Sequence, residues 1–110
     1  MYSYFLGAER AEGWFPFRQL VKLNCNTFES FVYDAGDDNV VSEPMLVPRS
    51  NQESDNDGFL LSIIHDASNK RTKLMVWESR QFEEGPIGEC WIGELIPWCV
   101  HGSFYPDFNP

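Results

Sequence analysis

The regular alternation of short apolar runs with turn-forming residues constrains the fold most strongly. The runs recur at intervals of about ten residues, a spacing typical of antiparallel β structure. They are rich in β-branched and aromatic residues, which suit a pleated, half-buried strand. The clearest runs are QLVKLN (19–24), FESFVY (28–33), FLLSIIH (59–65), TKLMVWE (72–78) and IGECWIGEL (87–95). The pattern predicts an all-β chain of antiparallel sheets with little helix.

The connections between these runs refine the prediction. Residues 25–27 join the first two runs, which predicts a hairpin with a short loop. Residues 40–48 contain Pro44 and Pro48, which restrict this extended segment to a strand edge, a strand end or a bulge. The polar residues 49–58 predict a surface loop suited to disorder. Residues 43–95 thus contain four short strands, as one propeller blade or a small meander does.

Composition limits the class of protein. A hydrophobic content of 43% in 110 residues predicts one packed domain or a piece of one. The formal net charge is −9, and no basic cluster exceeds Lys70 with Arg71, so we expect no nucleic-acid partner. Three cysteines at unhelpful spacings predict free thiols in a reducing, intracellular compartment. The sequence shows no targeting signal and no apolar run near the roughly 18 residues of a transmembrane helix.

The order of four motifs resembles the end of the carotenoid oxygenase family, whose members are also called carotenoid cleavage dioxygenases. In that family an E-P-hydrophobic-V-P segment precedes a D-D-G strand, and the chain closes on P-Y-G-F-H-G. The motifs here are SEPMLVPR (42–49), DGFLLSIIHD (57–66), KLMVWESRQF (73–82) and IPWCVHGSF (96–104). The opening residues 2–30 are similar to the family's Y-x-Y-x-x-G segment and the hairpin that follows it. The resemblance covers nearly the whole chain.

This resemblance implies a fold and a function. The fold is the last one to two blades of a seven-bladed β-propeller. Residues 1–38 would form part of one blade, residues 39–97 a four-stranded blade, and residues 98–110 a closing strand with an iron-ligand histidine. The function is that of an iron(II)-dependent dioxygenase, which uses O2 to cleave a polyene double bond of a carotenoid or apocarotenoid into two carbonyl products. For a plant or algal member of the family, the resemblance also implies plastid residence.

The resemblance also assigns site residues. His101 corresponds to the last of the family's four iron-binding histidines, and neutral imidazole is a good Fe(II) ligand. Glu43 corresponds to a glutamate that accepts the free ring N–H of a ligand histidine and fixes its tautomer. Trp98 and Phe104 flank His101 and would line a substrate tunnel. The alternatives are a histidine bonded to backbone near the chain end, an exposed strand glutamate, and aromatic residues of a sheet core.

Two other arrangements of ligand-type residues carry less weight. His65 matches a variable strand-to-turn position of the family, so we expect it at the surface or bonded within a turn. Cys90, Cys99 and His101 could be imagined as zinc ligands, but their spacing is unlike the short C-x2–4-C knuckle. The aromatic residues Trp77 and Trp91 are expected in a sheet core.

The chain also departs from the family's pattern. Residues 98–100 are Trp-Cys-Val where the family has Tyr-Gly-Phe, and two histidines cannot build a site that needs four. We therefore expect a fragment that does not catalyse the reaction alone. Two alternatives remain open. The chain could be a non-catalytic module that associates through exposed propeller edges by strand addition, or a degenerate relic of the family.

Overall fold

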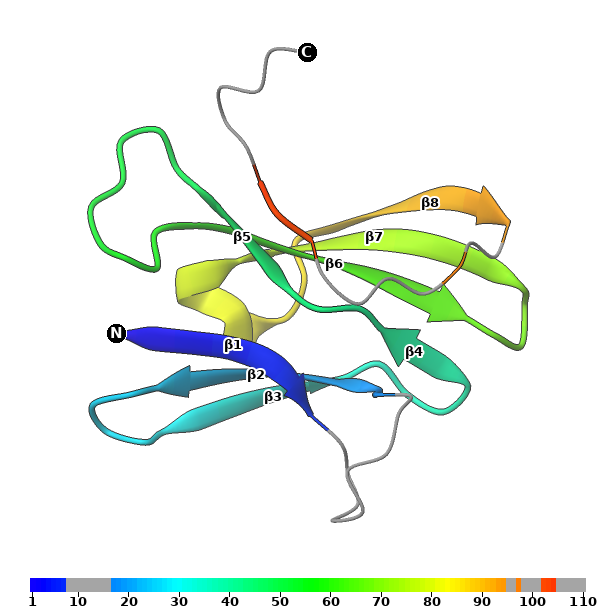
Figure 1. The fold of residues 1–110 in the computed structure, drawn as a ribbon, viewed down its shortest axis with the longest axis horizontal. Coiled ribbons are helices and arrows are strands. Elements are labelled where there is room, and N and C mark those ends of the chain that lie inside the picture. Colours follow the sequence, from blue (N-terminus) through cyan, green and yellow to red (C-terminus); the bar gives the residue numbers. More distant parts are fainter. Residues whose placement is uncertain (8–16, 95–96, 98–101, 105–110) are drawn as a thin grey trace.

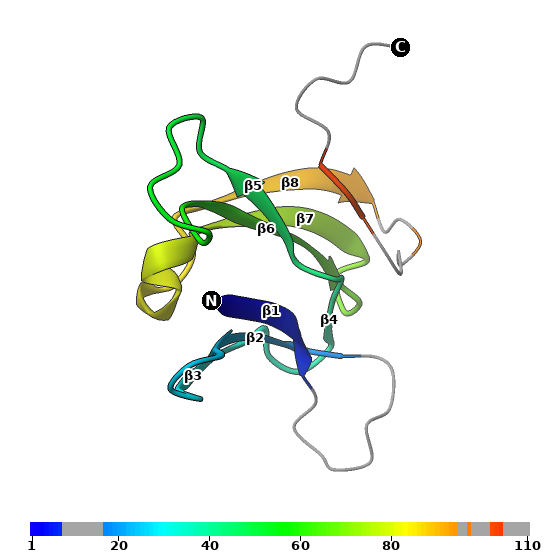
Figure 2. The same ribbon diagram turned by 60° about the vertical axis from the view of Figure 1, so that its left-hand side comes forward.

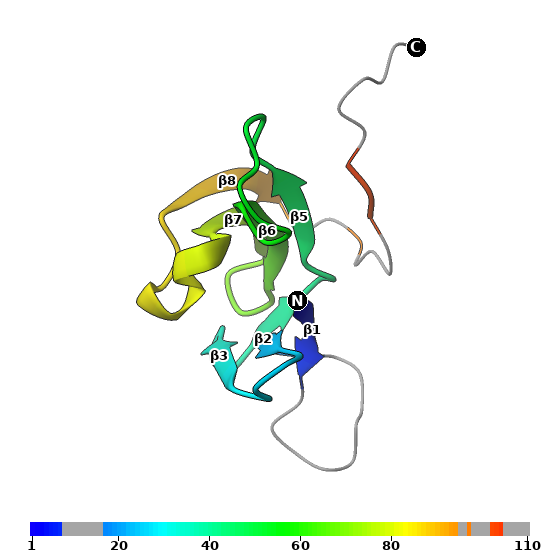
Figure 3. The ribbon, with the colours of Figure 1, turned by 90° about the vertical axis from the view of Figure 1, so that its left-hand side faces the viewer.

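Two antiparallel sheets make up the protein in the computed structural model, which describes residues 1–7, 17–94, 97 and 102–104. Figure 1 shows the strands, and the two sheets lie as neighbouring layers (Figure 2, Figure 3). Sheet A has the order β1-β2-β3, and sheet B has the order β4-β6-β7-β8 with β5 also paired to β6. The strands are β1 (Tyr2–Gly7), β2 (Gln19–Asn24), β3 (Ser30–Asp34), β4 (Asn39–Val41), β5 (Met45–Pro48), β6 (Gly58–Asp66), β7 (Arg71–Glu78) and β8 (Gly88–Glu94). The prediction of an all-β chain with antiparallel sheets is confirmed.

The hairpin of β2 and β3 forms where the sequence predicted it. Leu20 pairs with Tyr33, and Val21 pairs with Val32. The loop is closed by the Asn24 side chain, which accepts hydrogen bonds from the backbone N–H of the two residues that follow Cys25, at 2.9 and 3.2 Å. β3 begins at Ser30 rather than at residue 28, because Phe28 has a φ of 62° and cannot continue a strand.

Sheet B contains an interrupted edge strand. β4 and β5 lie on the same side of β6, with Val41 opposite Ile64 and Met45 opposite Leu61. Three residues, 42–44, therefore lie opposite two residues of β6, 62–63, so the edge carries one extra residue, as a β-bulge does. Pro44, which has no N–H to give to the ladder, lies within this break.

The hydrophobic core lies between the two sheets. Trp77 of β7 is fully buried, and its ring meets Tyr33 of β3 edge-on at a centroid distance of 5.2 Å. The ring of Phe82 lies 5.7 Å from the same indole. Trp77 thus joins the two sheets, as expected for a core aromatic residue. The buried core residues are Leu20, Val41, Leu60, Ile64, Met75, Trp77 and Phe82.

The loop from β5 to β6 lies at the surface over residues 50–55, as predicted, but it is held by specific contacts rather than disordered. Its Asp57 is only 1% exposed and accepts hydrogen bonds from Arg49 Nε and from the backbone N–H of Glu53, both at 2.9 Å. Arg80 lies 3.3 Å from the same carboxylate. Three groups of the chain therefore meet at one buried acid, and the loop is fixed to the segment that follows β7.

A 3-10 helix, η1 (Ser79–Glu84), follows β7. The Ser79 hydroxyl donates hydrogen bonds to the backbone carbonyls of Asn56 and Gly58, the latter at 2.9 Å. Gly58 itself has no room for a side chain, because a Cβ atom would lie 2.2 Å from the carbonyl oxygen of Val47. The start of β6 and the start of η1 are thereby held together. Within the described ranges, no helix has the length and apolar character needed to cross a membrane.

Candidate functional site

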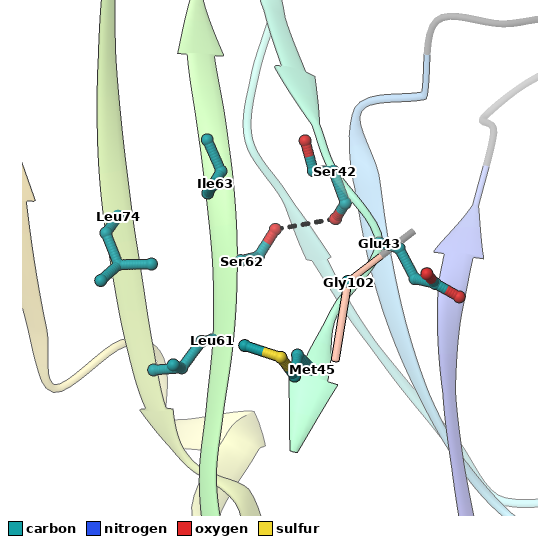
Figure 4. A pocket seen from close by; sticks show the side chains of 8 residues that line it. All are labelled: Ser42, Glu43, Met45, Leu61, Ser62, Ile63, Leu74 and Gly102. Atoms are coloured by element: carbon teal, nitrogen blue, oxygen red, sulfur yellow. Dashed lines mark hydrogen bonds between the residues drawn. The ribbon is translucent and has the colours of Figure 1, made fainter. Parts of the chain in front are cut away.

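A pocket of about 240 Å³ lies beside the break between β4 and β5, and its lining comes from four segments of the chain (Figure 4). Its apolar wall comes from β5, β6 and β7. Leu61 and Ile63 alternate with the core residues Leu60 and Ile64, so they face away from sheet A. The lining residues are Ser42, Glu43, Met45, Leu61, Ser62, Ile63, Leu74 and Gly102.

Glu43 lies in the break, and its side chain is exposed. Figure 4 shows its carboxylate directed away from β6, at the margin of the pocket. Gly102, which follows the predicted iron ligand in sequence, lines the same pocket. The structure thus brings Glu43 close to the C-terminal segment. His101 itself lies outside the described residues, so its contact with Glu43 stays a prediction.

Of the two predicted tunnel residues, the structure describes only Phe104. Trp98 lies outside the described residues, together with most of the predicted closing segment 98–110. Phe104 is described, is 42% exposed, and is not part of the lining of the pocket beside Glu43. Its role as a tunnel residue stays a prediction.

His65 corrects the expectation of a surface or turn position. It is only 5% exposed, and its Nε2 lies 3.3 Å from the Ser42 hydroxyl oxygen, within hydrogen-bonding distance. The turn begins one residue later. There Asp66 accepts hydrogen bonds from Asn69 Nδ2 at 2.8 Å and from the Ser68 hydroxyl at 3.0 Å, and the Asn69 bond is the main cause that lowers the pKa of this carboxyl. Leu61, Ile63 and His65 share one face of β6, so the apolar run was the sequence signal that could have placed His65 on the face directed away from sheet A.

The described residues do not form a metal site. Among them no group of three histidine, cysteine, aspartate or glutamate side chains could hold a metal ion. His65 is engaged with Ser42, and Cys25 and Cys90 are free thiols. The iron ligand that the family resemblance implies, His101, lies outside the described residues, so the iron site stays a prediction. The zinc arrangement of Cys90 with Cys99 and His101 is not tested, because the last two lie outside the described residues.

Trp91 of β8 is not a core residue, in contrast to the expectation. It is 39% exposed, and the Arg71 guanidinium lies 3.6 Å from its ring centroid. The ammonium of Lys73 lies 5.0 Å from the same centroid. Trp91 thus contacts the charged groups of two cations near the edge of sheet B.

The fold of the chain is that of part of a known β-propeller. It matches a solved structure of a mutant Synechocystis apocarotenoid oxygenase with a TM-score of 0.85 and 24% identity. The match covers 93% of this chain and 21% of that protein. The class defined by the fold is therefore an antiparallel propeller segment.

The sequence identifies the family. The profile of the family described as retinal pigment epithelial membrane protein matches residues 1–106. The chain therefore belongs to this family, that of the carotenoid oxygenases.

Individual relatives carry the same relationship. The chain is 24% identical over 103 residues to the apocarotenoid-15,15'-oxygenase of Synechocystis, and this alignment covers 94% of the chain. It is 23% identical over 101 residues to the isoeugenol monooxygenase of Pseudomonas nitroreducens, which covers 92% of this chain. In both cases the matched region is 21% of the relative. The chain spans about a fifth of the length of these enzymes.

Proposed function

We propose that the chain is the C-terminal part of an iron(II)-dependent dioxygenase that cleaves a carbon–carbon double bond of a carotenoid or apocarotenoid. The observation that carries this proposal is the family match over residues 1–106. The reaction adds both atoms of O2 across the cleaved bond and yields two carbonyl products. A relative that acts on isoeugenol, an aromatic alkene, makes a smaller conjugated alkene the alternative substrate.

In this proposal the chain supplies only part of the active site. His101 is the iron ligand that it contributes, and Glu43 orients a ligand histidine by accepting its ring N–H. The placement of Glu43 and Gly102 around one pocket supports this assignment. Iron, when bound, would supply the site at which O2 is activated. The remaining imidazoles would come from polypeptide outside this chain, because the sequence contains only two histidines.

The second candidate function is a non-catalytic interaction module. It is favoured by β8, all of whose residues are exposed and which, in the described part of the chain, pairs only with β7. A free strand edge can accept another strand by backbone hydrogen bonding. In this case the chain would associate with a β-rich partner and need no metal.

The isolated chain is expected to bind less than stoichiometric iron and to produce no aldehyde. Binding energy at a metal site depends on the number of ligands and on a site already formed by the fold. The measurement adds Fe(II) to residues 1–110 under nitrogen and determines bound iron by elemental analysis. Air is then admitted, and aldehyde formation from a carotenoid in detergent is followed. Stoichiometric iron with turnover that is lost in His101→Ala would contradict the proposal of a partial site.

A chimera tests whether the chain retains the catalytic function of its family. Residues 1–106 would replace the matching fifth of the Synechocystis apocarotenoid oxygenase. We expect the chimera to bind iron and to cleave an apocarotenoid, and His101→Ala in the chimera to abolish turnover. The matched control is His65→Gln, which changes the other histidine and should retain iron. A folded, iron-loaded chimera without turnover would favour the interaction module or a relic.

A further inference from the structure

We propose that Ser42 and His65 are positioning residues for Glu43: they fix the β-bulge that directs the Glu43 side chain out of the sheet. This inference rests on the proposed function, which places Glu43 at the functional site. It concerns only residues of this chain, and it adds a role for the second histidine.

The bulge determines on which face Glu43 lies. Continuing the register of β4, in which Val41 lies opposite Ile64, would place Glu43 opposite Ser62. Ser62 lies between the core residues Leu60 and Ile64 and is buried, so the carboxylate would face the core. An unpaired buried carboxylate is strongly unfavourable. The extra residue between β4 and β5 shifts the register and leaves Glu43 exposed at the pocket.

Ser42 is held on β6 through three of its atoms. Its backbone N–H donates to the carbonyl of Ile63 at 2.9 Å, and its carbonyl accepts from the Ser62 hydroxyl at 2.9 Å (Figure 4). Its hydroxyl oxygen lies 3.3 Å from His65 Nε2. The side chains of Ser42, Ser62 and His65 are buried. A satisfied polar network in a buried place fixes one conformation. The residue directly before Glu43 is thus immobilised, and Pro44 directly after it has a restricted backbone.

His65 makes the third contact to Ser42. Of the three contacts, it is the one made by a long side chain. The imidazole reaches Ser42 from a position two residues beyond Ile63 on the same face of β6. A side chain at position 65 without a polar nitrogen at this place would leave the Ser42 hydroxyl without this partner. The direction of Glu43 therefore depends on a residue that does not line the pocket itself.

The test is the side-chain direction of Glu43 in the metal-free chain, measured by NMR from the nuclear Overhauser effects of its Hβ and Hγ protons. We expect Ser42→Ala and His65→Phe to lose the wild-type pattern, because both remove the contact while conserving most of the shape. Ser42→Thr keeps a hydroxyl and His65→Gln supplies an amide nitrogen at the required position. Both variants should therefore keep the wild-type pattern. Ser68→Ala, at an exposed hydroxyl in the next turn, is the matched control and should leave the pattern unchanged.

Unchanged Glu43 contacts in both Ser42→Ala and His65→Phe would overturn the inference. The cross-strand contacts of β1 with β2 show whether each variant is folded. Should the two variants unfold, Ser62→Ala decides, because it removes only the bond to the Ser42 carbonyl. Wild-type Glu43 contacts in that variant would equally contradict the inference. Since no metal or substrate is present, this result is independent of whether the chimera is active.

Discussion

Replacing Trp77 by alanine is expected to remove a large part of the protein's stability. Removal of a fully buried tryptophan costs about 3–5 kcal/mol, and domains of this size are stable by only about 5–15 kcal/mol. Trp77 contacts both Tyr33 of sheet A and Phe82 of η1, so its loss also separates the two layers. The measurement is the urea midpoint of the chain, followed by far-ultraviolet circular dichroism.

Two variants show whether this loss comes from core packing. Trp91→Ala removes the same side chain from the exposed part of sheet B, where it contacts Arg71 and Lys73, and should lower stability by only about 0.5–1 kcal/mol. Trp77→Phe keeps an aromatic ring and removes an indole N–H that is buried without a hydrogen-bond partner among the described residues. It should therefore cost far less than Trp77→Ala. Equal midpoints for Trp77→Ala and Trp91→Ala would contradict the assignment of Trp77 to the core.

Strand positions were predictable from the sequence where apolar periodicity is local. The segment 19–24 coincides with β2, and 59–65 and 72–78 lie within one residue of the ends of β6 and β7. Features that depend on tertiary contacts were not predictable. Residues 49–58 are polar, which favoured disorder, but their one buried acid meets Arg80 from outside the segment as well as Arg49 within it. The start of η1 likewise depends on Ser79 bonds to the carbonyls of Asn56 and Gly58, at the start of β6.

The candidate site shows the same distinction. Glu43 could be proposed from the motif of residues 42–49, because the family resemblance assigns a role to that position. The bulge around Glu43 could be anticipated only in part, because Pro44 was equally compatible with a strand edge, a strand end or a bulge. The role of His65 was missed, since a histidine followed by Asp66 and a polar turn resembles a strand end. Its partner is 23 positions away in sequence, and no local pattern indicates such a contact.

Removal of the buried carboxylate of Asp57 is the second change with a large expected effect. Asp57→Ala leaves the backbone N–H of Glu53 without its acceptor and deprives Arg49 and Arg80 of a shared anion. Groups that lose a charged partner in a buried site keep their desolvation cost. We expect a marked fall in the urea midpoint at pH 7. Asp55→Ala, at an exposed aspartate of the same loop, should stay close to the wild type.

The pH dependence of the same comparison gives an independent check. The hydrogen bond from the Glu53 backbone N–H, followed by that from Arg49, holds the pKa of Asp57 below its usual value. A carboxyl whose pKa is lower in the folded state stabilises the protein above its unfolded-state pKa of about 3.9. That stabilisation is lost as the pH falls through the lower, folded-state pKa. The midpoints of the wild type and Asp57→Ala should therefore differ by a constant amount from pH 7 to about pH 5 and converge below about pH 4. A difference that persists unchanged into strong acid would show that Asp57 acts by shape rather than by charge, because protonation would then remove nothing that the wild type depends on.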